Sequence, residues 1–305
     1  MRRQRLHVFA LLGALLFGLG CQNVAGPSSD PDTLRRLDSD TLTSIVAELK
    51  LHLREDGYRF DRALLADGRD VLSVSLWKLD RLQQLRATPA SEWENVDRVI
   101  EFARGRALER LRRYGEARAA FERVAASGSV LAAAAFEAAM VMARFDTSAD
   151  TSGGTPELGT AEIQSQVDRW RTLAREFAGT SYQSLALEEA EAWEMLRVGW
   201  HERAEGNERA ILSCERLIEA NRASKLYSRH LLRLGDLYSD LARYVYLRSR
   251  AQGRLDILRY EEHIDRALAA YELAAEDRRS GLRKQARTRI EALLAYHQGN
   301  LAYVR

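Results

Sequence analysis

The regular spacing of apolar residues constrains the fold more than any other feature of the sequence. From Asp40 onward, apolar residues recur every three or four positions, as in TSIVAELKLHL with Ile45, Leu49 and Leu53. The next segment, DVLSVSLWKLDRLQQL, keeps this spacing with Leu72 among its apolar residues, although its first residues alternate as in a strand. The spacing matches the turn of an amphipathic α-helix with one face buried. The chain is therefore predicted to be all-α.

Further amphipathic segments predict helices along the rest of the chain. Ser91 and Glu94 have the spacing of a capping box, which marks a helix start. The ranges expected to be helical beyond Arg110 are 129–145, 161–177, 182–204, 207–220, 225–250, 255–276 and 280–297. Between two of them, residues 146–160 are small, polar and glycine-rich, which predicts a surface loop insertion.

The first residues have the layout of an export signal. MRRQR is basic, and the apolar run LHVFALLGALLFGLG that follows it is shorter than the roughly 20 residues that span a bilayer. The run ends in FGLGC, which resembles a bacterial lipobox, with Gly18 where that family usually has leucine. The resemblance implies that residues 1–20 are a lipoprotein signal peptide and that Cys21 is lipidated. An uncleaved signal anchor with Cys21 as an incidental thiol is the alternative.

The residues after Cys21 extend this interpretation. QNVAGPSSDPD is polar and rich in turn-forming residues, so 21–39 is expected to be a flexible tether. Within the lipoprotein class, Gln22 implies sorting to the outer membrane, with the body facing the periplasm. The only other cysteine, Cys214, then has no partner for an internal disulfide and is expected to be a small buried hydrophobe.

The charge of the mature chain argues against one class of partner. Without the three arginines of the leader, the chain carries 43 basic and 44 acidic residues. A nearly neutral surface has no long-range field that attracts a phosphate backbone. Nucleic acid is therefore not an expected partner.

Small and aromatic residues recur beside short turns in the helical region. Gly105 precedes Ala117 and Phe121, with Tyr114-Gly115 expected to form the turn between them. A second copy has Leu234, Gly235 and Tyr238, followed by Ala267, Tyr271 and Ala274. A weaker third copy, EGNERAILSCERL, has Asn207 as an expected cap, then Ala210, Cys214 and Leu217, and Trp170 is the aromatic of a further copy.

These placements resemble the tetratricopeptide repeat, in which small residues let two helices approach and an aromatic ring fills the gap. The spacing is irregular, and Leu231 stands where the repeat has tryptophan. The resemblance implies a right-handed α-solenoid of antiparallel helix pairs with irregular long helices, and a concave groove lined by the first helix of each pair. It also implies an N-terminal helical cap at 40–90, repeats at 91–277 and a C-terminal capping helix at 278–305.

No pattern in the chain predicts catalysis. The six histidines lack the three- or four-residue spacing of a zinc pair, and no nucleophile elbow, phosphate loop or dinucleotide fingerprint is present. Glu188, Glu189 and Glu191 lie close together, but charged helix faces usually lie in solvent. The chain is therefore expected to be no enzyme and to need no metal or cofactor.

One helix is enriched in residues that favour interfaces. DLYSDLARYVYLRSR contains Arg243, Tyr244, Tyr246 and Arg248, which form a candidate binding face. The alternative is that the tyrosines pack in the core while the arginines face water.

Two functions fit these observations. The first is an outer-membrane lipoprotein that scaffolds an envelope assembly by binding protein partners in the concave groove. The alternative is a ligand-binding lipoprotein that delivers a small solute to a transporter, which a deep apolar pocket favours. An envelope hydrolase is a third class, with no motif that supports it.

Overall fold

The structure, a computed structural model, describes residues 31–53, 58–59, 61, 63–85, 94–146, 159–253, 256–278 and 280–302. The expected leader, Cys21, the Ser91 cap and most of the loop insertion lie outside the described residues.

The described residues form eleven helices, which confirms the all-α prediction. Apart from an isolated bridge between Leu64 and Asp70, they contain no β-structure. The helices are α2 Pro31–Leu53, α3 Val71–Leu85, α4 Glu94–Arg110, α5 Tyr114–Ala125, α6 Ala132–Phe145, α7 Thr160–Glu176, α8 Ser181–Ala204, α9 Asn207–Ala220, α10 Tyr227–Ala251, α11 Ile257–Ala275 and α12 Ser280–Ala302.

The N-terminal boundary of the helical region differs from the expectation. Helix α2 begins at Pro31, so residues 31–39 are helical, where the sequence pattern predicted tether. Proline at the first helical position is favoured because its fixed φ suits the helix and its missing N–H is not needed there. The strand-like alternation at the start of α3 is overridden by Leu72, Leu76 and Leu79, which are buried in one core.

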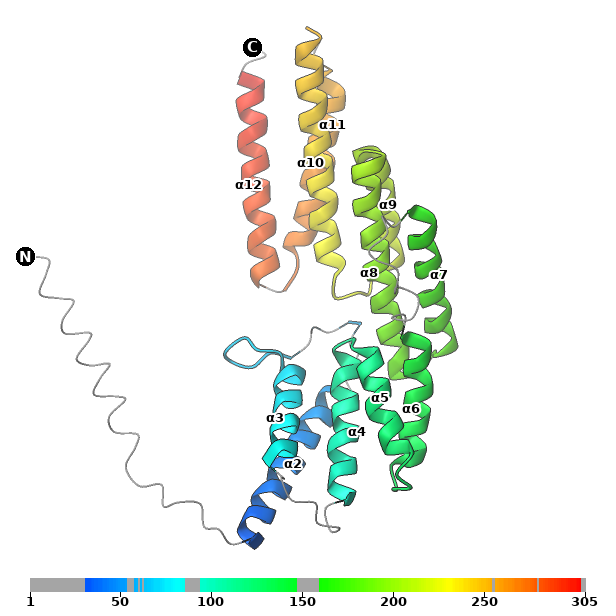
Figure 1. Ribbon diagram of the computed structural model, residues 1–305. Coiled ribbons are helices and arrows are strands. Elements are labelled where there is room, and N and C mark those ends of the chain that lie inside the picture. Colours follow the sequence, from blue (N-terminus) through cyan, green and yellow to red (C-terminus); the bar gives the residue numbers. More distant parts are fainter. Residues whose placement is uncertain are drawn as a thin grey trace, which may run out of the picture.

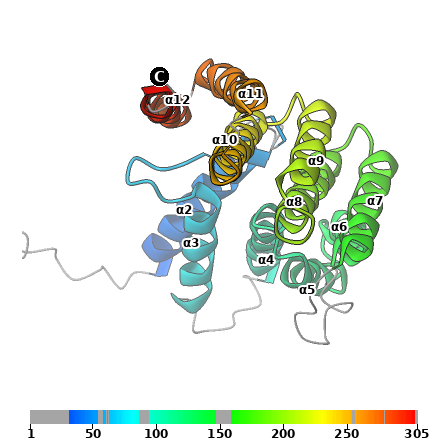
Figure 2. The same ribbon diagram turned by 90° about the horizontal axis from the view of Figure 1, so that it is seen from above.

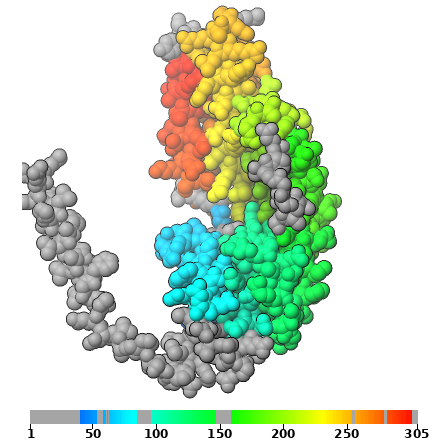
Figure 3. All heavy atoms as spheres, viewed as in Figure 1, coloured from blue at the N-terminus to red at the C-terminus, as the bar shows by residue number. Residues whose placement is uncertain are grey.

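Most helices pack against their neighbours along the chain, and α6 and α7 are the exception, since α6 packs mainly on α5 and α7 mainly on α8 (Figure 1). Seen from above, α4 to α12 follow an arc, with α4, α8 and α10 toward its inner side and α5, α7 and α11 toward its outer side (Figure 2). In the space-filling view the surface is indented between α3, drawn in cyan, and α12, drawn in red (Figure 3).

Two hydrophobic cores hold the arc together. The first runs from α2 to the first half of α8 and includes Phe121 and Trp170. The second runs from Val198, in the second half of α8, to α12 and includes Cys214 and Tyr271. Helix α8 therefore belongs to both cores and joins them.

Two helix contacts depend on the absence of a side chain at a glycine. A Cβ atom added at Gly105 would lie 2.6 Å from Cε1 of Phe121, and one added at Gly235 would clash with the ring of Tyr271. Only glycine leaves room for these rings. The residues expected to pack the repeats are buried, with Leu234 partly so: Gly105, Ala117, Phe121, Trp170, Ala210, Cys214, Gly235, Tyr238, Ala267, Tyr271 and Ala274.

Two local predictions are wrong. Tyr114 and Gly115 are the first residues of α5 instead of the turn, which is made by residues 111–113 with Arg112 in the left-handed region at φ 63°. Asn207 does not cap α9 but is its first residue, and the cap position belongs to Gly206 at φ 89°. Glycine is favoured there because it adopts a positive φ without strain.

Candidate binding site

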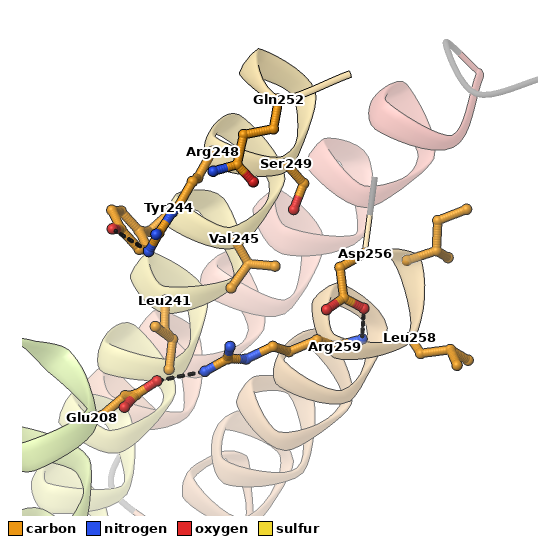
Figure 4. A pocket seen from close by; sticks show the side chains of 11 residues that line it. Glu208, Leu241, Tyr244, Val245, Arg248, Ser249, Gln252, Asp256, Leu258 and Arg259 are labelled. Atoms are coloured by element: carbon orange, nitrogen blue, oxygen red, sulfur yellow. Dashed lines mark hydrogen bonds and ion pairs between the residues drawn. The ribbon is translucent and has the colours of Figure 1, made fainter. Parts of the chain in front are cut away.

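A pocket of about 720 Å³ opens where α10 ends and α11 begins, next to the start of α9 (Figure 4). Its walls come from the last turns of α10, the first turn of α11 and Glu208 of α9. Its volume exceeds that of a single side chain and lies in the size range of ligand and peptide pockets.

An aromatic ring and a guanidinium group line one wall together. Tyr244 is 54% exposed, and Nη1 of Arg248 donates a hydrogen bond of 3.2 Å to its hydroxyl. The guanidinium carbon of Arg248 lies 5.9 Å from the centre of the Tyr244 ring, within cation–π range. Figure 4 shows both side chains on the same side of α10. This arrangement presents an apolar ring and a positive charge side by side.

The opposite wall combines an apolar residue with an internally paired set of charges. Leu258, on the first turn of α11, is 82% exposed. Arg259 Nη2 lies 2.6 Å from Glu208 Oε1, and the backbone N–H of Arg259 donates to Asp256 Oδ1 at 3.2 Å. The charges of Arg259 and Glu208 neutralise each other, whereas the Asp256 carboxylate, which accepts from a neutral backbone N–H, keeps its negative charge. Arg248, in contrast, has no carboxylate partner among the residues that the structure describes.

The four residues of the predicted binding face do not share one face. Tyr244 and Arg248 do, because residues four apart are neighbours on a helix. Tyr246 is buried in the second core, with its ring centre 5.5 Å from that of Tyr260. Arg243 is exposed on another side, where its guanidinium lies 5.4 Å from the ring of Tyr296 in α12. Half of the predicted face is therefore absent from the pocket.

A second polar arrangement, on α8, was not predicted. Glu188, Glu191 and Glu194 are buried, so the expectation of a solvent-facing acidic stretch is wrong for Glu188 and Glu191. The three carboxylates follow one another at three-residue spacing and lie along one side of the helix. We call these three residues and their partners the α8 polar cluster.

Every carboxylate oxygen of the three glutamates has a partner. Glu188 accepts from Arg112 at 2.6 Å and from Lys225 at 2.9 Å. Glu191 accepts from the Ser224 hydroxyl at 2.7 Å, and its other oxygen lies 2.6 Å from His230 Nε2.

The third glutamate and a tyrosine complete the cluster. Glu194 accepts from Asn221 Nδ2 at 2.9 Å and pairs with Arg171. The hydroxyl of Tyr58 donates to Asn221 Oδ1 at 3.0 Å, and the Tyr58 carbonyl accepts from the Lys225 N–H at 2.9 Å. Burial, with the nearby carboxylates of Glu191 and Glu194, raises the pKa of the Tyr58 hydroxyl, which stays protonated as a donor. Tyr58 thus covers α8 from a segment far away in sequence.

The α8 polar cluster is suited to structure more than to chemistry. All six carboxylate oxygens of its glutamates are paired, although Nδ1 of His230 has no hydrogen-bond partner among the described residues, and Tyr58 is buried beside them. The sequence signal for it is weak: the opposite side of α8 is also buried, through Leu185, Ala186 and Ala190, so the helix lacks a polar face for solvent. Burial of the three glutamates is indicated only by their three-residue spacing together with the buried apolar residues on the opposite side of the helix.

Cys214 is placed in the second core. It is fully buried, its thiol donates toward the His230 carbonyl at 3.7 Å, and burial raises its pKa to about 12. Such a thiol is a poor nucleophile, because the thiolate is the reactive form.

Two searches of the described residues bear on other kinds of site. No group of three His, Cys, Asp or Glu side chains among them is arranged to hold a metal ion. None of the helices formed by these residues combines the length and apolar character that a membrane span requires.

Comparisons with known proteins give no relative for this chain. No protein-family model matches the sequence, and no curated protein matches it.

Proposed function

We propose that the chain is a periplasm-facing lipoprotein, anchored in the outer membrane through Cys21, that acts as a protein-interaction scaffold in an envelope assembly. The anchor part of this proposal is supported by the export-signal layout and by the lipobox-like FGLGC, both read from the sequence. In this proposal the lipid at Cys21 holds the helical body next to the membrane, and the body itself is not inserted into the bilayer.

The proposal includes a tetratricopeptide-like architecture. Its support is the recurrence of one contact, a glycine of one helix against an aromatic ring of another, at Gly105 with Phe121 and at Gly235 with Tyr271. Helices that pack in this way with their neighbours form a right-handed solenoid in the proposed architecture, and such arrays serve many unrelated binding tasks.

The observation that carries the scaffold function is the exposed pair of Tyr244 and Arg248 in the α10–α11 pocket. Tyrosine and arginine are enriched among the residues that contribute most binding energy at protein interfaces. A half-exposed tyrosine ring is an apolar surface that a partner would remove from water. The buried carboxylates of α8 are already paired within the protein, so we assign binding to the α10–α11 pocket and not to a groove along α8.

The chemistry of the pocket defines the partner. Tyr244 offers apolar contact to a side chain, and the guanidinium of Arg248 beside it is available to a carboxylate. The proposed occupant is a segment of a partner protein that carries an apolar side chain next to an acidic residue.

Co-purification tests this function. The tagged full-length protein is crosslinked mildly in cells, extracted in detergent and analysed for associated proteins. A Tyr244→Ala/Arg248→Gln variant is compared with Trp77→Ala/Arg81→Gln, which removes the same types of exposed side chain at the same spacing from α3. We expect one envelope protein that the first variant loses and the second keeps. Loss from both variants, or from neither, contradicts the assignment.

The alternative function, binding of a small solute for a transporter, is favoured by one observation. The cavity volume of about 720 Å³ lies within the range of roughly 300–1,000 Å³ for small-molecule sites. A thermal-shift screen of small solutes decides between the two, because only this alternative predicts a compound whose stabilisation is lost in Tyr244→Ala/Arg248→Gln.

A further inference from the structure

We propose that a second pocket, between α7, α8 and α9, binds a phosphate group through Arg197, Arg209 and Arg216 and the hydroxyl of Ser213. This pocket has a volume of about 340 Å³ and shares no lining residue with the α10–α11 pocket. The proposal does not depend on the scaffold function.

The charge of the pocket is positive. Three arginines line it, and Glu205 is the one acidic residue of its walls. Glu205 Oε2 lies 3.3 Å from Arg209 Nε and 3.1 Å from Nδ1 of His201. With His201 left out of the count, the walls carry two uncompensated positive charges. A phosphate dianion matches this excess with both charges on one tetrahedral group that fits between the arginines, whereas a dicarboxylate of the same charge spreads it over two separate groups.

Two of the arginines have no ion pair with an acidic residue in the part of the chain that the structure describes. Arg197 donates to the side-chain oxygen of Gln164, which is neutral. Burial lowers the pKa of Arg197, the neighbouring charges of Arg171 and Arg216 lower it further, and only Glu194 and Asp168 act against them. Arg216 has no ion pair among the described residues and is exposed toward the pocket. An anion placed between these two guanidinium groups relieves their mutual repulsion.

A buried hydroxyl supplies an independent indication of a ligand. Ser213 lines the pocket and is 6% exposed, yet its Oγ has no hydrogen-bond partner in the part of the chain that the structure describes. A buried polar group without a partner destabilises the protein, because its hydrogen bonds to water are lost and not replaced. A phosphate oxygen in the pocket would accept this hydrogen bond.

The start of α7 contributes less than its position suggests. Thr160 and Ala161 line the pocket, and a helix N-terminus attracts anions. The carboxylate of Glu162, however, lies against Gly159 at this helix start. A Cβ atom added at Gly159 would lie 2.6 Å from Glu162 Oε2. The arginines, and not the helix amides, are therefore the main source of binding. Leu212, which is exposed at the rim, offers apolar contact to a group attached to the phosphate.

To test the proposal, ligand is titrated into the detergent-solubilised full-length protein at constant ionic strength. Isothermal titration calorimetry measures the binding. Three probes are used: inorganic phosphate, glycerol 3-phosphate and succinate. We expect saturable binding of a phosphate probe, and binding of succinate at least tenfold weaker. Tighter binding of glycerol 3-phosphate assigns an esterified phosphate, and tighter binding of inorganic phosphate assigns the free ion.

Variants separate the pocket from general charge effects. Arg216→Gln should weaken phosphate binding at least tenfold, while Arg283→Gln, which removes an exposed charge from α12, should leave it unchanged. Ser213→Ala should weaken binding about fivefold without lowering the melting temperature, since it removes an unsatisfied hydroxyl. The proposal is overturned if no phosphate probe binds saturably, if succinate binds equally well, or if Arg216→Gln and Ser213→Ala titrate like the wild type.

Discussion

At the scale of single residues, the most demanding environment is that of Glu191. Its carboxylate is buried between the Ser224 hydroxyl and the His230 ring, and neither partner reaches solvent. Removal of a buried, hydrogen-bonded charge leaves its partners desolvated and unpaired, which costs more than the net value of the bonds themselves.

We therefore expect Glu191→Ala to lower the free energy of unfolding by about 3 kcal/mol or more. Urea denaturation of the full-length protein in detergent measures the change. Glu219→Ala, an exposed glutamate on α9, is the control and should stay within about 0.5 kcal/mol of wild type. A loss below about 1 kcal/mol for Glu191→Ala would contradict the role given to the α8 polar cluster.

Cys214 gives a second prediction at this scale. With a pKa of about 12, the thiol is almost entirely protonated at pH 8, and the second core covers it. Iodoacetamide should therefore leave Cys214 unmodified in the folded protein and label it after denaturation, as followed by peptide mass mapping. Rapid labelling under native conditions would mean that the α9–α10 packing opens readily.

At the scale of elements, two helix contacts depend on glycine. Gly105→Ala places a methyl group against the Phe121 ring and should lower the free energy of unfolding by about 1–3 kcal/mol. Gly199→Ala is the matched control: this glycine lies inside α8, and an added Cβ meets only the end of the Arg203 side chain at 3.4 Å. Alanine there should stabilise the helix by about 0.5–1 kcal/mol.

Thermal and chemical denaturation of both variants measure the two changes in the free energy of unfolding. Opposite signs are expected for them. If both substitutions stabilise the protein, α4 and α5 do not approach as closely as described.

The positions of most helices could be predicted from sequence, and their long-range partners could not. The α9 pattern predicted residues 207–220 and the helix is Asn207–Ala220, because apolar periodicity is a local property. Its cap was misassigned, since glycine and asparagine are both acceptable at that position and tertiary packing decides between them. The boundaries of α10 differ from the predicted 225–250 by two residues at its start and one at its end, whereas α2 begins nine residues before the predicted Asp40.

The candidate sites depend on long-range contacts that local sequence patterns do not reveal. Tyr244 and Arg248 were found by composition, but their separation from Tyr246 follows only from the side of α10 that packs against α11 and α12. The α8 polar cluster was missed because the partners of Glu188 are Arg112, 76 residues away, and Lys225, 37 residues away. Single-sequence patterns carry no record of such pairings.

At the scale of the whole molecule, α8 belongs to both hydrophobic cores and joins them into one arc. The proposed anchor at Cys21 precedes the described helices in sequence, whereas the α10–α11 pocket lies within the second core's half of the chain. In the proposed function this separation lets a tethered body present its binding site away from the attachment point.

The measurement that tests the scaffold proposal most directly is site-specific photocrosslinking in cells. A photoreactive phenylalanine analogue replaces Tyr244 in one strain and Trp77, an equally exposed aromatic residue on α3, in another. We predict one discrete crosslinked protein from position 244, none from position 77, and loss of the product when Cys21→Ala removes the proposed anchor. No product from position 244, or the same product from both positions, would contradict the proposal.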